Sequence, residues 1–429
     1  MLRKYLYELG LAIRNNNIYH HYDFLQESQT WTIEQLHAHQ LNWLKILVKS
    51  AYDNCEYYRD KYDGLDVKPN DITCLDDLKK IPIITKEELL NSSKKIQNNK
   101  GSDKLFYSET SGSTGKPLVF YRSKDWDAWH RASIFRGYSW YGVEPWERNG
   151  YLWGFNIALT KRIKTRFLDW LQNRFRLFSY KDAEINIFAR RLYDVSFLSG
   201  YSSMIYEVAK RINRDTNKRR QYHLKMVKGT SEKIFDVYQP EVERAFGKKM
   251  ISEYGSAEGG IIAFECPKGN MHINMETVIV EEEDGEIIVT NLVSSSFPII
   301  RYKLGDYISI DKDTKCACGM QHYIIKDILG RVGKVIYGIK DQYPSLTLYY
   351  VFKNLAMVHN VVLNYQAIQS NKGSLKVNIE NSLDLKIRGL LNKEFYKYFM
   401  DDLTVEIKDG VDLKITTRKR TDFISELQT

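Results

Sequence analysis

A loop rich in serine, threonine and glycine carries the residues of this chain best suited to bind phosphate. It spans Ser108–Pro117, and the apolar segment Leu118–Tyr121 follows at once. The glycines let backbone N–H groups turn toward an anion, while the hydroxyls and the lysine add donors and a positive charge. The spacing differs from the Walker loop, and an ordinary Ser/Gly turn is the alternative to a polyphosphate site. The candidate ligands are Ser111, Gly112, Ser113, Thr114, Gly115 and Lys116.

Three of the five cysteines and one histidine form a candidate zinc site. Cys316 and Cys318 are a tight pair, and Cys266 precedes His272 by six residues. Three thiolates and one imidazole are a common tetrahedral ligand set for a structural Zn²⁺. The alternative is that the thiols are unconnected core residues and that the histidine is a hydrogen-bonded strand residue. The odd cysteine count argues against a disulfide framework.

Basic and aromatic residues alternate through the stretch Lys161–Tyr180. We expect a basic amphipathic helix there, which would lie on an anionic membrane or bind a polyanionic glycan. A surface helix with a buried aromatic stripe is the commoner use of such a pattern and stays open as the alternative.

The composition is that of a globular protein. The chain has 429 residues, 43% of them hydrophobic, and its 63 basic and 54 acidic residues give a net charge of +9. The basic residues are spread along the chain without a recognised nucleic-acid-binding motif, which argues against a nucleic-acid partner. No stretch approaches the roughly 18 consecutive apolar residues of a membrane span, and the first residues lack the apolar core of a signal peptide. We therefore expect a cytoplasmic protein, with contact at the inner face of the membrane if the amphipathic segment binds lipid.

The hydrophobic pattern predicts an α/β protein with a smaller second domain. Behind a capping box of Thr32 and Gln35, apolar residues recur at helical spacing from Ile33 to Val48. From Leu105 onward, short apolar strands alternate with helices, which favours an α/β sheet. The pattern changes after about residue 338. The elements expected there are a helix over Tyr343–Leu355, strands over Val361–Ile368 and Ser374–Glu380, a helix over Leu385–Phe399 and a strand over Thr404–Lys408.

Five short motifs occur in the order in which one protein family carries them. They are Ser111–Pro117, Tyr254–Glu258, Gly285–Thr290, Pro298–Asp306 and Gly330–Arg331. With these motifs the sequence resembles the adenylate-forming superfamily, and within it the phenylacetate–CoA ligase-like branch that includes the CapK-type capsular polysaccharide biosynthesis proteins. The resemblance covers essentially the whole chain. It implies an α/β adenylate-forming ligase fold, with a large N-terminal domain over residues 1–332, helical over about 1–100, and a small α+β C-terminal lid over 333–429.

The resemblance also implies an ATP-dependent, AMP-forming ligase. Such an enzyme joins a carboxylic acid to ATP, releases pyrophosphate and passes the acyl-adenylate to an amine or thiol acceptor. Tyr254 would stack on adenine, Gly255 would allow close approach of the substrate carboxylate, and Glu258 would hold Mg²⁺ between phosphate oxygens. An ordinary strand end at Tyr254-Gly255 and a solvated helix residue at Glu258 are the alternatives.

Further residues complete the nucleotide site that the resemblance implies. Asp306 matches the aspartate that accepts hydrogen bonds from both ribose hydroxyls, and Arg331 would approach the ribose or the phosphates. Ser231 and Glu232, which follow Thr230, resemble the family's adenine edge.

A C-terminal lysine acts on the carboxylate and the α-phosphate in this superfamily. The segment Thr416–Ile424 resembles the one that carries it, with Lys419 at the lysine position. Arg418 and Arg420 leave this register open by one residue. A solvated basic tail is the alternative.

Two departures from the family pattern bear on catalysis. Ala257 replaces the hydroxyl residue that usually precedes Glu258, and Ser256 would substitute for it. Gly333 replaces the usual hinge aspartate, although a glycine also absorbs a backbone rotation. These departures support an alternative from another class, a nucleotide-binding homologue that has lost catalysis.

Large rings around the expected acyl pocket would limit the size of the acid. The residues that the resemblance assigns to this pocket are Trp153, Phe155, Gly200 and Tyr201. The CapK-like branch favours acylation or amide formation in capsular or O-antigen polysaccharide synthesis, with a sugar amine or an amino acid as acceptor. An acyl-CoA ligase of the phenylacetate–CoA ligase type, with coenzyme A as the thiol, is the enzymatic alternative.

Overall fold

A large mixed sheet is the centre of the larger of two units into which the chain divides. The computed structural model describes residues 2–98, 104–110, 117–153, 159–178, 182–214, 221–231, 234, 238–328, 335–359, 361, 363, 365–411 and 423–427. The larger unit comprises Met1–Ser108 and Phe120–Gly330, and the smaller one Glu109–Val119 and Arg331–Thr429.

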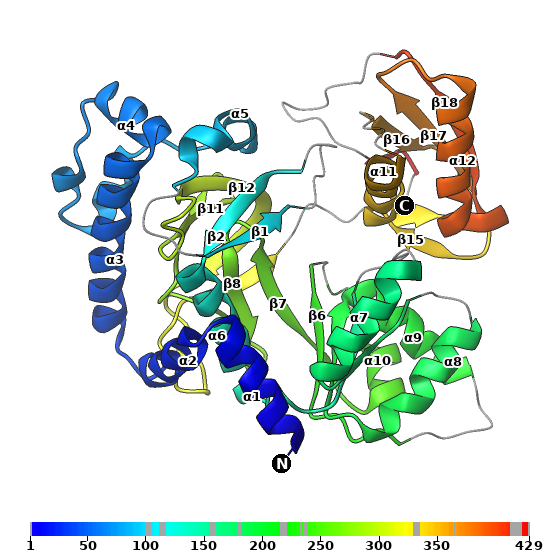
Figure 1. Ribbon diagram of the computed structural model, residues 1–429, viewed down its shortest axis with the longest axis horizontal. Helices are drawn as coiled ribbons and strands as arrows, with labels where there is room; N and C mark the ends of the chain where they lie inside the picture. Colours follow the sequence, from blue (N-terminus) through cyan, green and yellow to red (C-terminus); the bar gives the residue numbers. More distant parts are fainter. Residues whose placement is uncertain are drawn as a thin grey trace. The chain divides into compact units, whose positions relative to one another are not determined.

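Among the described residues, eleven strands form the sheet of the larger unit (Figure 1). In spatial order they are β10 (Val278–Glu283), β11 (Glu286–Asn291), β12 (Ile299–Asp311), β13 (Ile324–Ile328), β9 (Met271–Ile273), β8 (Gly260–Glu265), β7 (Met250–Ser256), β6 (Met226–Thr230), β5 (Phe197–Tyr201), β3 (Asn149–Leu152) and β4 (Arg174–Arg176). The strands from β7 to β4 are parallel, whereas those from β7 to β10 are antiparallel. Strand β7 therefore joins a parallel half to an antiparallel half.

Helices connect the strands of the parallel half, as expected for an α/β sheet. They are α7 (Leu159–Leu171), α8 (Asp182–Arg191) with the short helix η3 (Leu192–Asp194), α9 (Ser202–Arg214) and α10 (Tyr238–Phe246). The single helix expected over Lys161–Tyr180 is wrong in extent, because α7 ends at Leu171 and the edge strand β4 follows it. Pairing of β4 with β3 fixes that strand, and such long-range pairing is not visible in a local amphipathic pattern.

The first hundred residues are helical, as predicted. They form α1 (Leu2–Arg14), α2 (Asn17–Ser28), α3 (Ile33–Asn54), α4 (Glu56–Asp63), the short helices η1 (Pro69–Asp71) and η2 (Leu75–Lys80), and α5 (Lys86–Ile96). The capping box at the start of α3 is confirmed, since Thr32 accepts from the Gln35 N–H and the Gln35 side chain accepts from the Thr32 N–H. Ile84 connects this region to the sheet, because it forms an isolated parallel bridge with Tyr302 of β12.

A buried ionic cluster ties these helices to the sheet. Helix α6 (Lys124–Ser139) carries Arg136, whose Nη1 lies 2.5 Å from Glu276 Oε1. Ser28 of α2 donates to the same carboxylate at 2.7 Å, and His322 Nε2 lies 2.9 Å from it. Arg136 and Glu276 are thus buried as partners of opposite charge, which is the condition for burying a charge without a large desolvation cost.

The smaller unit has its own sheet and core. A hairpin of β14 (Val335–Tyr337) and β15 (Gln342–Pro344) precedes α11 (Leu346–His359), β16 (Tyr365–Gln369), β17 (Ser374–Ile379), α12 (Leu385–Phe399), η4 (Met400–Asp402), β18 (Thr404–Lys408) and β19 (Phe423–Ser425). The four strands β18, β17, β16 and β19 lie side by side in that order. Buried side chains of α11 and α12, including Val351 and Phe395, pack with Val377 of β17. The helix predicted from Tyr343 begins instead at Leu346, because β15 takes the preceding residues.

The short strands β1 (Leu105–Glu109) and β2 (Val119–Ser123) flank the predicted phosphate loop and form a two-stranded sheet. The Thr110 N–H donates to Leu118 O at 2.9 Å, and the Leu118 N–H donates to Thr110 Oγ1 at 3.0 Å. These two bonds close the base of the loop. The candidate ligands Ser111–Lys116 themselves lie outside the described residues.

Candidate active site and metal centre

The carboxyl ends of four parallel strands bring together candidate residues that are far apart in the sequence. Gly200 of β5 pairs with Leu152 of β3, so that Trp153 and Tyr201, the residues that follow them, lie at the same level. Tyr201 in turn pairs with Thr230, and Thr230 with Glu253, the residue before Tyr254. In open α/β sheets ligands bind outside this carboxyl edge. The expected acyl and adenine residues therefore occupy one edge of one sheet.

Tyr254 and Asp306 contact each other directly. The Tyr254 hydroxyl donates to Asp306 Oδ2 at 2.8 Å, although 52 residues separate them. Gly305, just before the aspartate, has φ of +94°, a conformation that glycine adopts without strain. The residues expected to meet adenine and ribose thus form one hydrogen-bonded pair across β7 and β12.

The candidate glycines are required by the packing of the sheet. A Cβ on Gly255 would lie 2.3 Å from Gly260 O in the β7–β8 hairpin. A Cβ on Gly200 would lie 2.2 Å from Leu152 O of the neighbouring strand. Both contacts are far below van der Waals distance, so no larger residue fits. Close strand approach accounts for both glycines without a ligand.

Glu258 lies in the turn between β7 and β8 and is 5% exposed. The alternative of a solvated helix residue is therefore wrong. Its carbonyl accepts from Asn291 Nδ2 at 3.0 Å, which anchors the turn on β11. Ser256 at the end of β7 accepts from the Gly259 N–H at 2.7 Å, and the same hydroxyl can donate its own proton. A carboxylate is the kind of oxygen ligand that binds Mg²⁺.

The two described rings of the expected acyl pocket stack on each other. The Trp153 and Tyr201 centroids are 4.3 Å apart with an interplanar angle of 10°. Arg176 of β4 donates to Trp153 O at 2.6 Å and so fixes the backbone that carries the indole. The stacked rings form a flat apolar surface at the end of β3 and β5. Phe155 lies outside the described residues.

Sequence reasoning missed a buried ion pair beneath this edge. Lys228 Nζ of β6 lies 2.6 Å from Glu253 Oε2 of β7, and the Thr230 hydroxyl donates to Glu253 Oε1 at 3.0 Å. Burial alone would lower the pKa of Lys228, but the neighbouring Glu253 carboxylate raises it to about 12. The pair locks β6 against β7 one residue before Tyr254. The available signal was a lysine inside the otherwise apolar segment Met226–Thr230.

One further candidate of the nucleotide site, Ser231, lies just beyond the end of a strand. Ser231 comes directly after β6 with φ of +66°, an uncommon conformation for a non-glycine residue that often marks functional positions. The remaining candidates Glu232, Arg331 and Lys419 lie outside the described residues, as does Gly333.

The four predicted metal ligands come together. The ligand atoms of Cys266, His272, Cys316 and Cys318 all lie within 4.8 Å of one another. Cys266 Sγ is 3.7 Å from Cys316 Sγ, and His272 Nε2 is 3.2 Å from Cys318 Sγ. The alternative of unconnected thiols is therefore wrong. A set of three sulfurs and one nitrogen at this spacing fits a tetrahedral zinc ion.

Surrounding groups prepare these ligands for a cation. His272 Nδ1 lies 3.2 Å from His322 O, which fixes the ring so that Nε2 faces the thiols. Burial lowers the pKa of His272 to about 4, so the imidazole is neutral at pH 7, the form that binds metal. The Lys268 N–H and the Asn270 amide donate to Cys266 Sγ and Cys316 Sγ at 3.4 and 3.1 Å. Such donors favour the thiolates and partly oppose burial, which raises the pKa of Cys266.

Comparisons with known proteins agree with this architecture. No protein-family model matches the chain. It is 24% identical over 356 residues to Protein CapK of Staphylococcus aureus, covering 80% of this chain and 78% of that protein. It is 24% identical over 311 residues to a phenylacetate-coenzyme A ligase of Pseudomonas putida, covering 68% and 70%. Among solved structures, 2-hydroxyisobutyryl-CoA ligase in complex with 2-HIB-AMP and CoA superimposes with a TM-score of 0.66 at 16% identity, over 93% of this chain and 91% of that one.

Proposed function

We propose that the chain, which is similar to Protein CapK and to a phenylacetate-coenzyme A ligase, is an adenylate-forming ligase that activates a carboxylic acid with ATP. The product would be an acyl-AMP, which then passes its acyl group to an amine or thiol acceptor. The observation that supports this most strongly is the carboxyl edge of the sheet, where the stacked Trp153–Tyr201 rings lie at the ends of β3 and β5, and the Tyr254–Asp306 pair starts from β7, two strands along from β5.

Each candidate has a chemical role in this proposal. The Ser111–Lys116 loop binds the phosphates, Glu258 holds Mg²⁺, and Asp306 accepts the ribose hydroxyls. Tyr254 positions Asp306 and offers its ring to adenine. Lys419 supplies a cation where charge develops on the α-phosphate as the carboxylate attacks. Arg331, Ser231 and Glu232 line the nucleotide. The acid rests against Trp153 and Tyr201, whose rings restrict its size.

We propose an amine acceptor, a sugar amine or an amino acid, and a role in surface polysaccharide synthesis. The relative CapK covers most of the chain and supports this choice. Coenzyme A is the alternative acceptor, favoured by the names of the phenylacetate-coenzyme A ligases and of 2-hydroxyisobutyryl-CoA ligase. Product analysis with coenzyme A and with amino sugars, after the acid is known, separates the two acceptors.

We also propose that the protein works in the cytoplasm and touches the inner face of the membrane peripherally. No helix in the described part of the chain is long and apolar enough to cross a bilayer. The proposed zinc ion at Cys266, His272, Cys316 and Cys318 is structural, because all four ligands come from the protein and leave no position for a substrate.

ATP–pyrophosphate exchange with pooled small carboxylic acids and amino acids tests the adenylation step. We expect exchange with one pool in the wild type, and a loss of about a hundredfold or more in Lys419→Ala, as for removal of a group that stabilises transition-state charge. Arg418→Ala and Arg420→Ala are the matched controls, and they keep most of the activity if the register is right.

Two outcomes would count against this proposal. Loss of pyrophosphate exchange in Arg418→Ala or Arg420→Ala, with Lys419→Ala still active, would show that the catalytic cation is that arginine and not Lys419. Silence across all pools, with ATP still bound in a calorimetric titration, would favour the catalytically silent nucleotide-binding homologue.

A further inference from the structure

Helices α1 and α7 expose apolar side chains in regular rows. On α1 the row is Tyr5, Leu9 and Ile13, which are 64%, 46% and 76% exposed. On α7 it is Ile163, Phe167 and Trp170, which are 75%, 58% and 52% exposed. Residues at these spacings share one face of a helix. Phe167 and Trp170 are exposed, whereas Phe175 and Phe178, later in the stretch Lys161–Tyr180, are buried, so the alternative of a buried aromatic stripe holds only in part.

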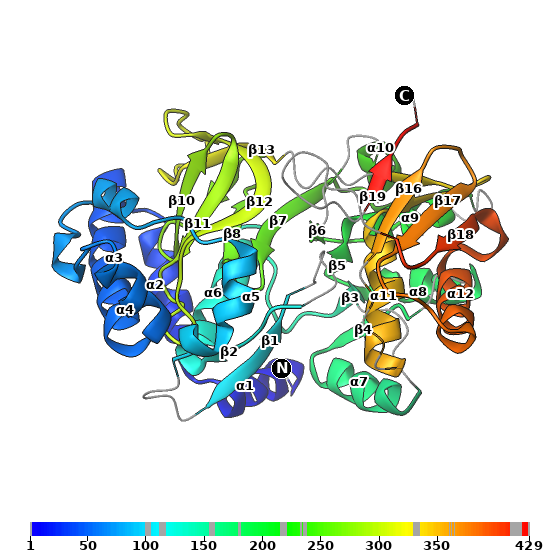
Figure 2. The ribbon, with the colours of Figure 1, turned by 90° about the horizontal axis from the view of Figure 1, so that it is seen from above.

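The two helices form one surface of the larger unit. They lie side by side in Figures 1 and 2, and contacts between them agree. Arg3 of α1 donates to Trp170 O at 3.1 Å, and its guanidinium lies 4.6 Å from the centre of the Trp170 ring. Two neighbouring amphipathic helices that each expose an apolar row are unusual in a protein without a partner there.

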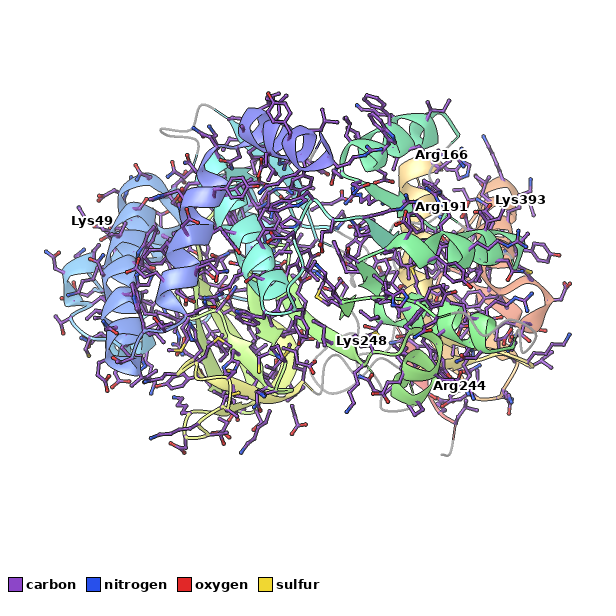
Figure 3. The ribbon with its side chains drawn as sticks, turned by 90° about the horizontal axis from the view of Figure 1, so that it is seen from below. Lys49, Arg166, Arg191, Arg244, Lys248 and Lys393 are labelled. Carbon is purple, nitrogen blue, oxygen red and sulfur yellow. The ribbon has the colours of Figure 1, made fainter. Side chains whose placement is uncertain are left out.

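A groove opens beside α7, between α8 and β4. It has a volume of about 500 Å³ and combines aromatic with cationic walls. The walls that matter for binding are Trp170, Phe175, Phe178, Arg166, Arg191 and Glu184. Figure 3 labels the two arginines, Arg166 on α7 and Arg191 at the end of α8.

The charges in this groove are not balanced. Asp169 is the ion-pair partner of Arg174 and Arg176, at 2.5 and 3.0 Å. Within the described residues, neither Arg166 nor Arg191 forms an ion pair. Instead, the Arg191 guanidinium lies 4.2 Å from the centre of the Phe175 ring, and that of Arg166 lies 5.6 Å from the centre of Phe178.

Neighbouring cations act on Arg191. Burial, and then Arg148 and Arg166, lowers the pKa of its guanidinium. Arg148 has a carboxylate partner of its own, Asp194, at 3.1 Å. Arginines that repel each other across an open groove favour an anion between them, and the planar guanidinium fork matches phosphate oxygens.

We propose that this surface binds an anionic phospholipid membrane, with a lipid phosphate held between Arg166 and Arg191 and the apolar rows of α1 and α7 entering the acyl boundary. The arginines alone would be enough to bind a free phosphate. The exposed apolar rows beside them favour a lipid, because they gain stability only in an apolar environment. Basic groups near such a surface add attraction to anionic lipids. The inference rests on the peripheral contact proposed above and is independent of the adenylation chemistry.

Sedimentation of the purified full-length protein with vesicles tests this. We expect binding to phosphatidylglycerol–phosphatidylcholine vesicles at low salt, and little binding to pure phosphatidylcholine. The double variant Arg166→Gln/Arg191→Gln should lower the partition coefficient about tenfold or more. Phe167→Ser/Trp170→Ser should lower it comparably. The matched control Lys248→Gln/Lys393→Gln removes the same charge from exposed positions labelled in Figure 3 and should bind nearly as the wild type does.

Several results would overturn the proposal. No wild-type binding at low salt would do so, as would equal loss in the lysine control, which indicates a general charge effect. Thermal stabilisation by inorganic phosphate without vesicle binding would make the groove a soluble-phosphate site. A dimer in solution that Phe167→Ser/Trp170→Ser dissociates would make the face an interface between two copies. ATP–pyrophosphate exchange measured on the same variants shows that they fold, and its absence in the wild type would bear on the proposed function alone.

Discussion

The Tyr254 hydroxyl and the Asp306 carboxylate form a 2.8 Å hydrogen bond that joins the junction strand β7 to β12. One carboxylate oxygen is thereby fixed in direction. A carboxylate that must accept two ribose hydroxyls gains from such a fixed orientation, because less side-chain freedom is lost when the nucleotide binds.

Substitutions in this pair should act on nucleotide binding in a defined order. Asp306→Asn removes the charged acceptor and should raise the KM for ATP about 10- to 100-fold, since hydrogen bonds to charged groups contribute about 1.5–3 kcal/mol. Tyr254→Phe removes only the orienting bond and should raise it less than about tenfold. ATP dependence of pyrophosphate exchange measures both effects. Tyr307→Phe, which alters an exposed hydroxyl next to Asp306, is the control. A larger effect in Tyr254→Phe than in Asp306→Asn would contradict the proposed roles.

The Lys228–Glu253 pair should behave as a buried charge pair. Lys228→Met leaves Glu253 buried without its cation and should lower the free energy of unfolding by about 3–5 kcal/mol. The double variant Lys228→Met/Glu253→Gln should recover much of that loss, because no unpaired charge remains. Urea unfolding measures the difference. Lys225 forms an ion pair with Glu147 near the surface and provides the control. Lys225→Met should lower the free energy of unfolding by less than about 1 kcal/mol. Equal losses in the single and double variants would show that the pair acts through packing and not through charge.

The sequence predicted local features better than contacts between distant strands. Thr32 and Gln35 form their capping box within four residues, so the motif alone was sufficient. The start of α11 was misplaced because the apolar residues around Tyr343 suit both a helix and a strand. Pairing of Tyr343 with Ile336 selects the strand.

The candidate site shows the same division. The sequence correctly predicted that four residues lie together, because few ligand sets satisfy zinc. They are Cys266, His272, Cys316 and Cys318. The contact between Lys228 and Glu253 depends on the register of β6 and β7, and no spacing along the chain encodes that register. The Tyr254–Asp306 bond likewise depends on the order of strands in the sheet, although each residue was singled out separately.

Metal content should follow the thiol cluster. Protein purified without chelator should contain about one equivalent of zinc, and Cys318→Ser should lose most of it together with thermal stability, because metal binding and folding are coupled. Cys74→Ser, which alters an exposed thiol outside the cluster, is the matched control and should keep both. Metal analysis and thermal unfolding with and without a chelator measure these changes. Zinc below about a tenth of an equivalent in the wild type would contradict a structural zinc site.

Acid should destabilise the fold in part through His130 of α6. The Nδ1 of this ring is buried without a hydrogen-bond partner, and burial, followed by the nearby Arg122 and Arg131, lowers the pKa of His130 to about 3. In the unfolded chain the imidazole takes up a proton below about pH 6.5, whereas in the folded chain it stays neutral until about pH 3. The unfolded state therefore binds more protons throughout this window, and stability must fall as the pH falls through it.

Between pH 7 and pH 5 this single group should lower the free energy of unfolding by about 2 kcal/mol. His130→Gln should remove that part of the pH dependence, while other titrating groups act equally on both proteins. Urea unfolding of wild type and variant at the two pH values measures the difference of differences. The exposed His223, replaced by Gln in the same way, is the matched control and should leave the wild-type pH dependence in place. Parallel stability profiles for wild type and His130→Gln would mean that the imidazole is protonated in the folded protein, a form that the Asp127 carboxylate on the same helix favours.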